Sequence, residues 1–229
     1  MRVHGPRWTG QRTPDSKAHP SRKVNTVKTD RQALRLAGKA SPRDHSRGSP
    51  LAKTTLVAYG DFASPACSQT YRTVKKIQEK MGPTLRYVYR SFPQPEQFPH
   101  SEQAAEAAEC ASSQGKFWEM HDSMFESEPG SRGISLSRCA EEAGLDLLRF
   151  RREMQAHVHA ERIQSVRQGG VRSGVGAAPA FFINSVRHES SFGLATLLAA
   201  VQASSGGESG RVENDFLANH KSRTKRRGV

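Results

Sequence analysis

A strand–helix–strand pattern between residues 54 and 92 constrains the fold more than any other feature of the sequence. Residues 54–59 form an apolar, β-branched run that ends at Gly60, which is typical of a buried strand. Apolar residues recur at spacings of three and four along residues 65–81, which predicts an amphipathic helix. A second strand is predicted over residues 85–92. This order predicts two parallel strands joined by a right-handed crossover.

The elements that follow predict an α/β fold in two halves. Residues 100–173 are mostly helical in pattern, with pieces at 101–112 and 116–126 and further helices that begin near Ser135, Asp146 and His157. A strand over residues 180–184, a short strand over 186–188 and an apolar helix over 192–202 complete the chain. We therefore predict a β-α-β half and a β-β-α half separated by a helical insertion.

The two ends of the chain carry almost all of its net charge of +13. Residues 1–50 hold twelve Lys or Arg against three Asp, and residues 204–229 hold six against three acidic residues. Both ends are polar and lack a sustained apolar period, so we expect disordered basic segments on either side of a domain over residues 51–203. The first segment is open to four interpretations: an arm for nucleic acid or an anionic surface, an organelle transit peptide, a solvated tail, or a start codon placed too far upstream. Neither tail interleaves aromatic residues with its charges, so we expect only nonspecific contacts with nucleic acid.

The cysteine content and the hydropathy of the sequence indicate the cellular compartment of the protein. No run approaches the roughly 18 to 20 apolar residues of a membrane span, and residues 1–50 lack the apolar centre of a secretory signal. Three cysteines do not describe a disulfide framework. We expect a cytoplasmic protein, or a periplasmic one if the start of the sequence is misassigned.

Three segments carry a family resemblance in the same order along the chain. Residues 57–67 run from a strand through a Gly-Asp-Phe turn into Ser-Pro-Ala-Cys, residues 114–122 read Gln-Gly-Lys-Phe-Trp-Glu-Met-His-Asp, and residues 173–184 contain Ala178-Pro179 before a strand. Together they resemble the DsbA-like branch of the thioredoxin superfamily, a thiol-disulfide oxidoreductase family. The resemblance covers residues of about 54 to 202 and implies a thioredoxin-like fold. It also implies a cis peptide bond before Pro179, in a loop that offers backbone groups to a substrate chain.

The chain departs from the family's Cys-Pro-x-Cys motif at the tip of the first helix. In the family, the first cysteine attacks as a thiolate favoured by the helix N-terminus, and the second resolves the mixed disulfide. Here Ser64 stands at the first position, followed by Pro65, Ala66 and Cys67. A hydroxyl cannot form a disulfide, and the turn holds no His or Lys as a base. This excludes ordinary dithiol oxidation by Ser64 with Cys67.

Each of these two residues has a structural and a functional interpretation. Ser64 before Pro65 is a preferred helix start, with an N-cap followed by Pro at N1. In kappa-class glutathione transferases and related isomerases of the same superfamily, a serine here hydrogen-bonds the glutathione thiolate. Cys67 lies on the apolar face of its helix, so it is either a small buried hydrophobic residue left from a redox pair or a lone thiol that forms mixed disulfides.

Three functions follow, and whether the chain is an enzyme stays open among them. The first is monothiol exchange through Cys67 with glutathione or a protein thiol. The second is a redox-inactive module whose groove near Ser64 and Pro179 binds an extended peptide. The third is a glutathione-dependent transferase or isomerase in which Ser64 orients a bound thiolate. Apart from glutathione we expect no cofactor, and the residues expected to contact a substrate are Pro65, Ala66, Ala178 and Pro179.

The remaining cysteines and histidines are predicted to be structural. Cys110 and Cys139 are expected to fill the core, and nothing local supports a disulfide between them. His157 and His159 are two residues apart, which points them to different helix faces, and no Cys or carboxylate stands at ligand spacing. We therefore predict no metal site from the sequence.

Overall fold

The computed structural model describes residues 34–127 and 134–206. The chain divides into two units, residues 1–32 and 33–229, and every described residue belongs to the second unit. Residues 1–33 and 207–229, which make up most of the basic segments expected at 1–50 and 204–229, lie outside the described residues. The description below concerns the second unit alone.

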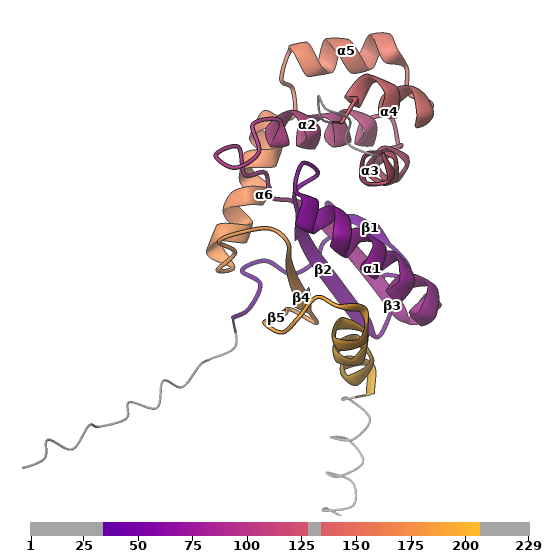
Figure 1. Cartoon of the computed structure of the whole chain (residues 1–229), viewed down its shortest axis with the longest axis vertical. Helices are drawn as coiled ribbons and strands as arrows, with labels where there is room; N and C mark the ends of the chain where they lie inside the picture. The colour runs from indigo at the N-terminus through magenta and orange to yellow at the C-terminus, as the bar shows by residue number, and fades with distance from the viewer. Residues whose placement is uncertain (1–33, 128–133, 207–229) are drawn as a thin grey trace, which may run out of the picture. The chain divides into compact units, whose positions relative to one another are not determined.

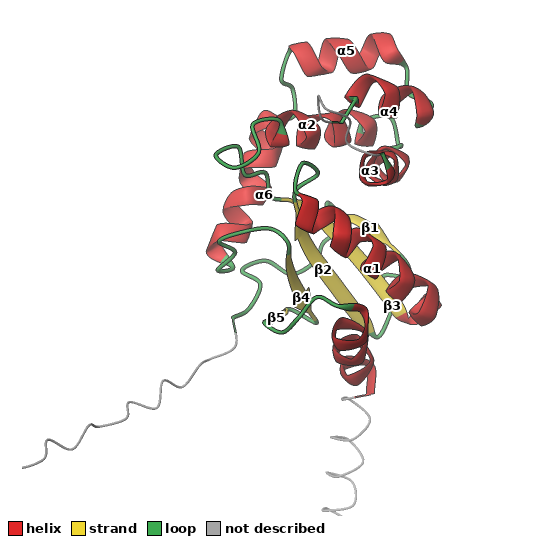
Figure 2. Ribbon diagram, viewed as in Figure 1, coloured by secondary structure: helices red, strands yellow, loops and turns green. Residues whose placement is uncertain are grey.

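A five-stranded mixed sheet forms the centre of this unit (Figures 1 and 2). Its strands, in the spatial order β1-β3-β2-β4-β5, are β1 (His45–Arg47), β3 (Leu85–Ser91), β2 (Thr54–Gly60), β4 (Ala180–Ile183) and β5 (Val186–His188). Strands β2 and β3 are parallel, and every other neighbouring pair is antiparallel. The predicted β-α-β and β-β-α halves are confirmed.

Helix α1 (Pro65–Met81) makes the crossover between β2 and β3 and lies across one face of the sheet (Figure 1). It begins because Ser64 caps it and Pro65 supplies the first helical position. Its apolar stripe of Cys67, Tyr71, Val74 and Ile77 is buried. The helix ends at Gly82, whose positive φ of 50° is a conformation that glycine adopts without strain.

The helical insertion separates the two halves, as predicted. It contains α2 (Ser101–Ser112), α3 (Phe117–Glu126), α4 (Leu136–Glu142), α5 (Leu147–Gln155) and α6 (Ala160–Arg172). Helices α2 to α5 gather beyond the end of the sheet at which α1 begins (Figure 1). A last helix is described over 194–206, two residues later than predicted, and it buries Leu197 and Val201 against the same core as α1.

Two apolar cores form on opposite faces of the sheet, because side chains alternate along each strand. In β2, Leu56 and Ala58 join the core of α1 and the insertion, whereas Val57 and Tyr59 join the smaller one. Helix α6 closes the smaller core at Gly170. A Cβ atom there would lie 2.8 Å from the ring of Phe92, so only glycine permits this approach.

The predicted start of the domain at residue 51 is corrected by the structure. Residues 34–50 are part of the domain, since Arg35 forms a β-bridge with Val186 and β1 pairs with β3. The Arg90 guanidinium in β3 donates to the Asp44 carboxylate at 2.7 Å and to the carbonyl oxygen of Gly38. Polar side chains and backbone bonds hold this segment, so it has no apolar period that could have predicted it.

Candidate functional site

The tip of α1 holds Ser64 in the geometry of a helix N-cap. The Ser64 backbone is extended, its side chain is 2% exposed, and the Cys67 backbone N–H donates to its Oγ at 3.5 Å. Pro65 and Ala66 follow on the exposed surface of the tip. The first position of the Ser-Pro-Ala-Cys segment is thus a buried hydroxyl that caps the helix.

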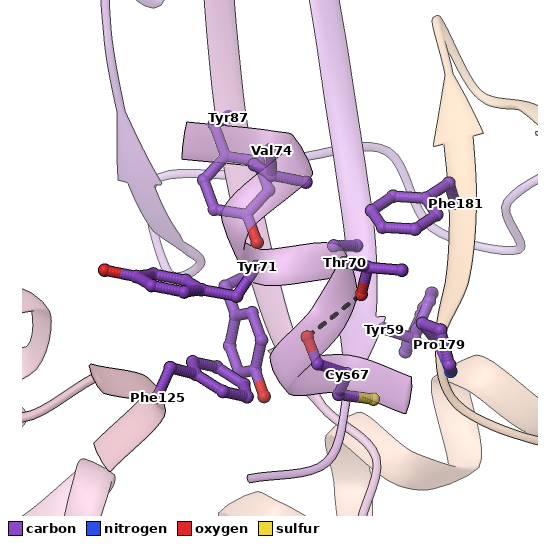
Figure 3. Close-up of a pocket in the computed structure, with 12 residues that line it drawn as sticks. Tyr59, Cys67, Thr70, Tyr71, Val74, Tyr87, Phe125, Pro179 and Phe181 are labelled. Carbon is purple, nitrogen blue, oxygen red and sulfur yellow. Dashed lines mark hydrogen bonds between the residues drawn. The ribbon is translucent and has the colours of Figure 1, made fainter. Parts of the chain in front are cut away.

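Cys67 supplies the sulfur atom of this site, and the residue is only 2% exposed. Figure 3 shows the sulfur pointing from α1 toward the segment that carries Pro179. The Asp61 backbone N–H donates to its Sγ at 3.3 Å. Burial raises the pKa of Cys67 to about 11, the nearby Asp61 carboxylate adds to the rise, and the hydrogen bonds from Asp61 and Ser64 oppose it. Cys67 is therefore a protonated thiol at neutral pH.

A small cavity lies beside Cys67, between α1 and the sheet (Figure 3). Its volume is about 20 Å³, which is room for about one water molecule. The lining is mostly aromatic and apolar, and comprises Ala58, Tyr59, Gly60, Cys67, Thr70, Tyr71, Val74, Tyr87, Tyr89, Phe125, Pro179 and Phe181. The cavity is therefore too small to hold a peptide side chain or a tripeptide.

A buried carboxylate ties the turn before α1 to the loop after β3. Asp61 Oδ1 accepts a hydrogen bond from the Ala63 N–H and Oδ2 accepts one from the Gln94 N–H, both at 2.9 Å. Burial raises the pKa of Asp61, although these two hydrogen bonds act in the opposite direction. Asp61 therefore organises the turn that carries Ser64.

Gln94 continues this network to the loop before β4. Its side-chain oxygen accepts a hydrogen bond from the Ala178 N–H, and the Ala178–Pro179 peptide bond is cis. Ala178 and Pro179 are half-buried. The backbone donor just before Pro179 is thus already paired inside the protein.

The six residues proposed from the sequence as site residues meet at one end of the sheet. Cys67 and Pro179 line the same cavity, and the Asp61–Gln94 network joins the helix tip to Ala178. Sequence reasoning missed Asp61 and Gln94. The Gly-Asp-Phe turn was a visible signal for Asp61, whereas Gln94 makes its contacts 33 and 84 residues away and carries no local signal.

The two other cysteines lie in the helical insertion, and all three cysteines are free and buried. Cys110 belongs to α2 and Cys139 to α4, where its Sγ lies 3.4 Å from Ser127 Oγ. The expectation that both are buried is confirmed.

Comparison with known proteins places this architecture in a family. A family model described as thioredoxin matches residues 40–203, and the chain therefore belongs to the thioredoxin family. Its sheet and helical insertion together have the DsbA-like form of the thioredoxin fold.

Solved structures of the same fold come from several bacteria. Oxidised BdbD from Bacillus subtilis superposes with a TM-score of 0.66 at 17% identity, over 76% of this chain and 98% of that one. Alpha-DsbA1 from Wolbachia pipientis gives 0.65 at 21% identity, over 76% and 96%. A thioredoxin-like oxidoreductase from Silicibacter pomeroyi gives 0.62 at 25% identity, over 71% and 92%.

Similar curated proteins are much longer than this chain. Na⁺/H⁺ antiporter NhaA 1 from Salinispora arenicola is 39% identical over 173 residues, which are 76% of this chain and 26% of that protein. NhaA 3 from Salinispora tropica is 37% identical over 180 residues, which are 79% of this chain and 28% of that protein. This chain thus spans about a quarter of their length. Among the helices of residues 34–127 and 134–206, none is long and apolar enough to cross a membrane.

Proposed function

We propose that this protein is a thioredoxin-fold module that binds an extended polypeptide segment at the tip of α1 and does not catalyse disulfide exchange. The observation that carries the proposal is the state of Cys67, which is 2% exposed and whose pKa is raised to about 11. Thiol-disulfide exchange requires a thiolate that a disulfide sulfur can reach in line. Burial opposes both requirements, and Ser64 provides no second sulfur.

The surface around the tip supports peptide binding. Pro65 and Ala66 are exposed and Ala178 and Pro179 are half-buried, so small apolar residues surround the buried thiol. An extended chain binds such a surface through backbone hydrogen bonds, and the side chains of the bound segment make apolar contacts with these small residues. In this proposal a carbonyl of the bound segment replaces the Gln94 side chain as the acceptor of the Ala178 N–H.

The longer relatives suggest the class of partner. They are named Na⁺/H⁺ antiporters, and this module corresponds to about a quarter of each. We infer that the bound segment belongs to an antiporter polypeptide, whether joined to this module or separate from it.

Peptide binding is tested with a fluorescent cysteine-free peptide from the antiporter sequence, followed by anisotropy. Ala178→Arg should abolish binding, because its side chain would cover the tip. Ala156→Arg, at an exposed position after α5, is the matched control and should bind normally. Gln94→Ala should tighten binding severalfold, since it removes the competing acceptor. Equal binding by the Ala178→Arg and Ala156→Arg variants would place the ligand elsewhere.

Monothiol exchange through Cys67, with glutathione or a protein thiol, is the second candidate. The hydrogen bond from the Asp61 N–H and the N-terminus of α1 both favour a thiolate, so any opening of the tip would expose a usable nucleophile. A transferase role for Ser64 has less support, because its hydroxyl is buried and caps the helix.

Mass spectrometry separates the redox proposals. The native protein is incubated with oxidised glutathione, and each cysteine is assayed for an adduct, with Ser64→Cys as the positive control. We expect no adduct on Cys67 without denaturant and a disulfide or adduct in the Ser64→Cys protein. An adduct on native Cys67, with Cys110 and Cys139 unmodified, would establish monothiol exchange in place of the redox-inactive module.

A further inference from the structure

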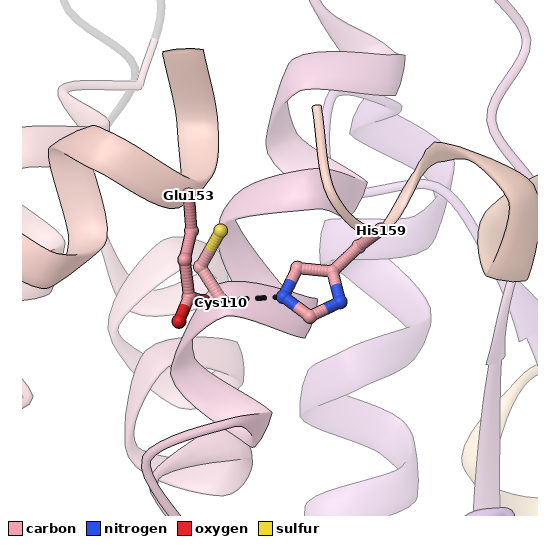
Figure 4. A group of neighbouring side chains, drawn as sticks. All are labelled: Cys110, Glu153 and His159. Atoms are coloured by element: carbon pink, nitrogen blue, oxygen red, sulfur yellow. Dashed lines mark hydrogen bonds and ion pairs between the residues drawn. The ribbon is translucent and has the colours of Figure 1, made fainter. Parts of the chain in front are cut away.

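Three helices of the insertion bring a thiol, a carboxylate and an imidazole together, away from the tip of α1. Cys110 belongs to α2, Glu153 to α5, and His159 precedes the first turn of α6. One potential ligand atom from each residue lies within 4.8 Å of the other two (Figure 4). Sequence spacing gave no sign of this cluster, because its members come from different helices.

The cluster is built from the core outward. Cys110 is 1% exposed, whereas the side chains of Glu153 and His159 are 16% and 20% exposed. The thiol therefore forms the floor of the site, and the other two groups form its rim.

Hydrogen bonds orient the carboxylate toward the imidazole. Arg149 Nε donates to Glu153 Oε1 at 2.7 Å, which leaves Oε2 to face His159 Nε2 at 3.2 Å and to accept from Ser113 Oγ at 2.8 Å. In metal sites, hydrogen bonds from neighbouring side chains to a carboxylate ligand fix the orientation of that carboxylate. A bound cation would take the place of the Glu153–His159 contact, with Arg149 and Ser113 still holding the carboxylate.

The electrostatic surroundings favour a cation. Carboxylates surround the thiol, because Glu106 and Glu109 lie on α2 with Cys110, and Glu153 belongs to the cluster itself. The guanidinium groups of Arg149 and Arg162 are each already paired with a carboxylate, Arg149 with Glu153 and Arg162 with Glu109.

We propose that Cys110, Glu153 and His159 bind a divalent transition-metal ion, with Zn²⁺ as the expected occupant. Thiolate and imidazole are the ligands that Zn²⁺ prefers, whereas Mg²⁺ and Ca²⁺ prefer oxygen alone. Three protein ligands leave the fourth tetrahedral position to solvent. On binding, the Cys110 S–H bond is replaced by an S–Zn bond and the proton is released to water, with no change in oxidation state. The ion would join α2, α5 and the start of α6.

Cobalt is the probe for this site, because a Co²⁺–thiolate bond gives a charge-transfer absorption in the near ultraviolet. The full chain is treated with a chelator, titrated with Co²⁺ alone, and then titrated with Zn²⁺. We expect one equivalent of Co²⁺ with a thiolate band, and its displacement by Zn²⁺. The melting temperature should rise when Zn²⁺ is added.

Matched variants distinguish the cluster from other thiols and imidazoles. His159→Gln and Glu153→Gln should each weaken Co²⁺ binding by at least about tenfold. Cys110→Ser should remove the thiolate band. His157→Gln and Cys139→Ser, a nearby histidine and another buried cysteine, should bind Co²⁺ as the original protein does. Cys110→Ser alters the core. If the Cys110→Ser protein does not fold, the proposal is tested with His159→Gln, which lies at the partly exposed rim.

Two results would overturn the proposal. One is binding of Co²⁺ with unchanged affinity in His159→Gln, and the other is the absence of a thiolate band at saturating Co²⁺. Neither depends on peptide binding or disulfide exchange at the tip of α1, so the two sites are tested separately.

Discussion

The reactivity of Cys67 offers a quantitative test of the view that burial has silenced its thiol. Its pKa is raised from 9.0 to about 11, mainly by burial, which corresponds to about 3 kcal/mol against the thiolate. At pH 7 the thiolate fraction is then roughly one in 10⁴ in the native protein and roughly one in 10² in the unfolded chain. Alkylation of Cys67 should therefore be at least about a hundredfold slower in the native protein, and slower still because only 2% of the residue is exposed.

The assay is alkylation by iodoacetamide at a series of pH values, with each cysteine followed by peptide mass spectrometry. The rate at Cys67 should rise about tenfold for each pH unit between pH 7 and about 10, without a plateau in that range. Asp61→Asn should raise the rate, since it removes a negative charge that raises the pKa of Cys67 and keeps the backbone N–H that bonds to its Sγ. A native rate within about tenfold of the unfolded rate at pH 7 would refute this reasoning.

Three further predictions concern stability. Gly60→Ala should cost about 1 to 3 kcal/mol in urea denaturation, because its Cβ would lie 2.6 Å from the Tyr89 ring; a loss below about 0.5 kcal/mol would contradict this contact. Arg90→Met should cost about 3 kcal/mol by leaving the Asp44 carboxylate unpaired, and a double-mutant cycle with Asp44→Asn should recover part of the loss. The unfolded chain loses the Cys67 proton at lower pH than the native protein does, so stability contributed by this thiol is present below pH 9 and is lost as pH rises toward about 11. The stability difference between the original protein and Cys67→Ala should therefore shrink by about 1 kcal/mol between about pH 8 and 10, and a constant difference would exclude the linkage.

Apolar periodicity predicted the elements whose stability comes from burial. The strands around 54–60 and 85–91, α1 and the helical insertion all follow patterns of period two or 3.6, so their positions were visible in the sequence. Strand β1 was not visible, because its three residues, His-Ser-Arg, are all polar and only partly buried. Its position depends on pairing with β3 and on the contacts of Arg90 with Asp44, which are nonlocal.

The candidate site was also predictable only in part, because several of its contacts join residues far apart in the sequence. The helical face predicted that Cys67 is buried, and the Ser-Pro sequence predicted that Ser64 caps α1. The link from Asp61 through Gln94 to Ala178 joins three loops that meet only after the sheet has formed. Neither the spacing of residues along the sequence nor their type indicates such a link.

The segment over residues 34–47 reaches both edges of the sheet, because it bonds beside β5 and supplies β1, the strand at the opposite edge. Leu36 and Arg187 donate backbone hydrogen bonds to Ser185 and Leu34 beside β5, and β1 covers the free edge of β3. Open strand edges recruit other chains into intermolecular sheets, and short, charged edge strands are a common protection against this. The first residues of the domain thus protect the edges of the sheet from pairing with strands of other molecules. A chain shortened to begin at residue 51 would keep the tip of α1 and would precipitate or assemble edge to edge.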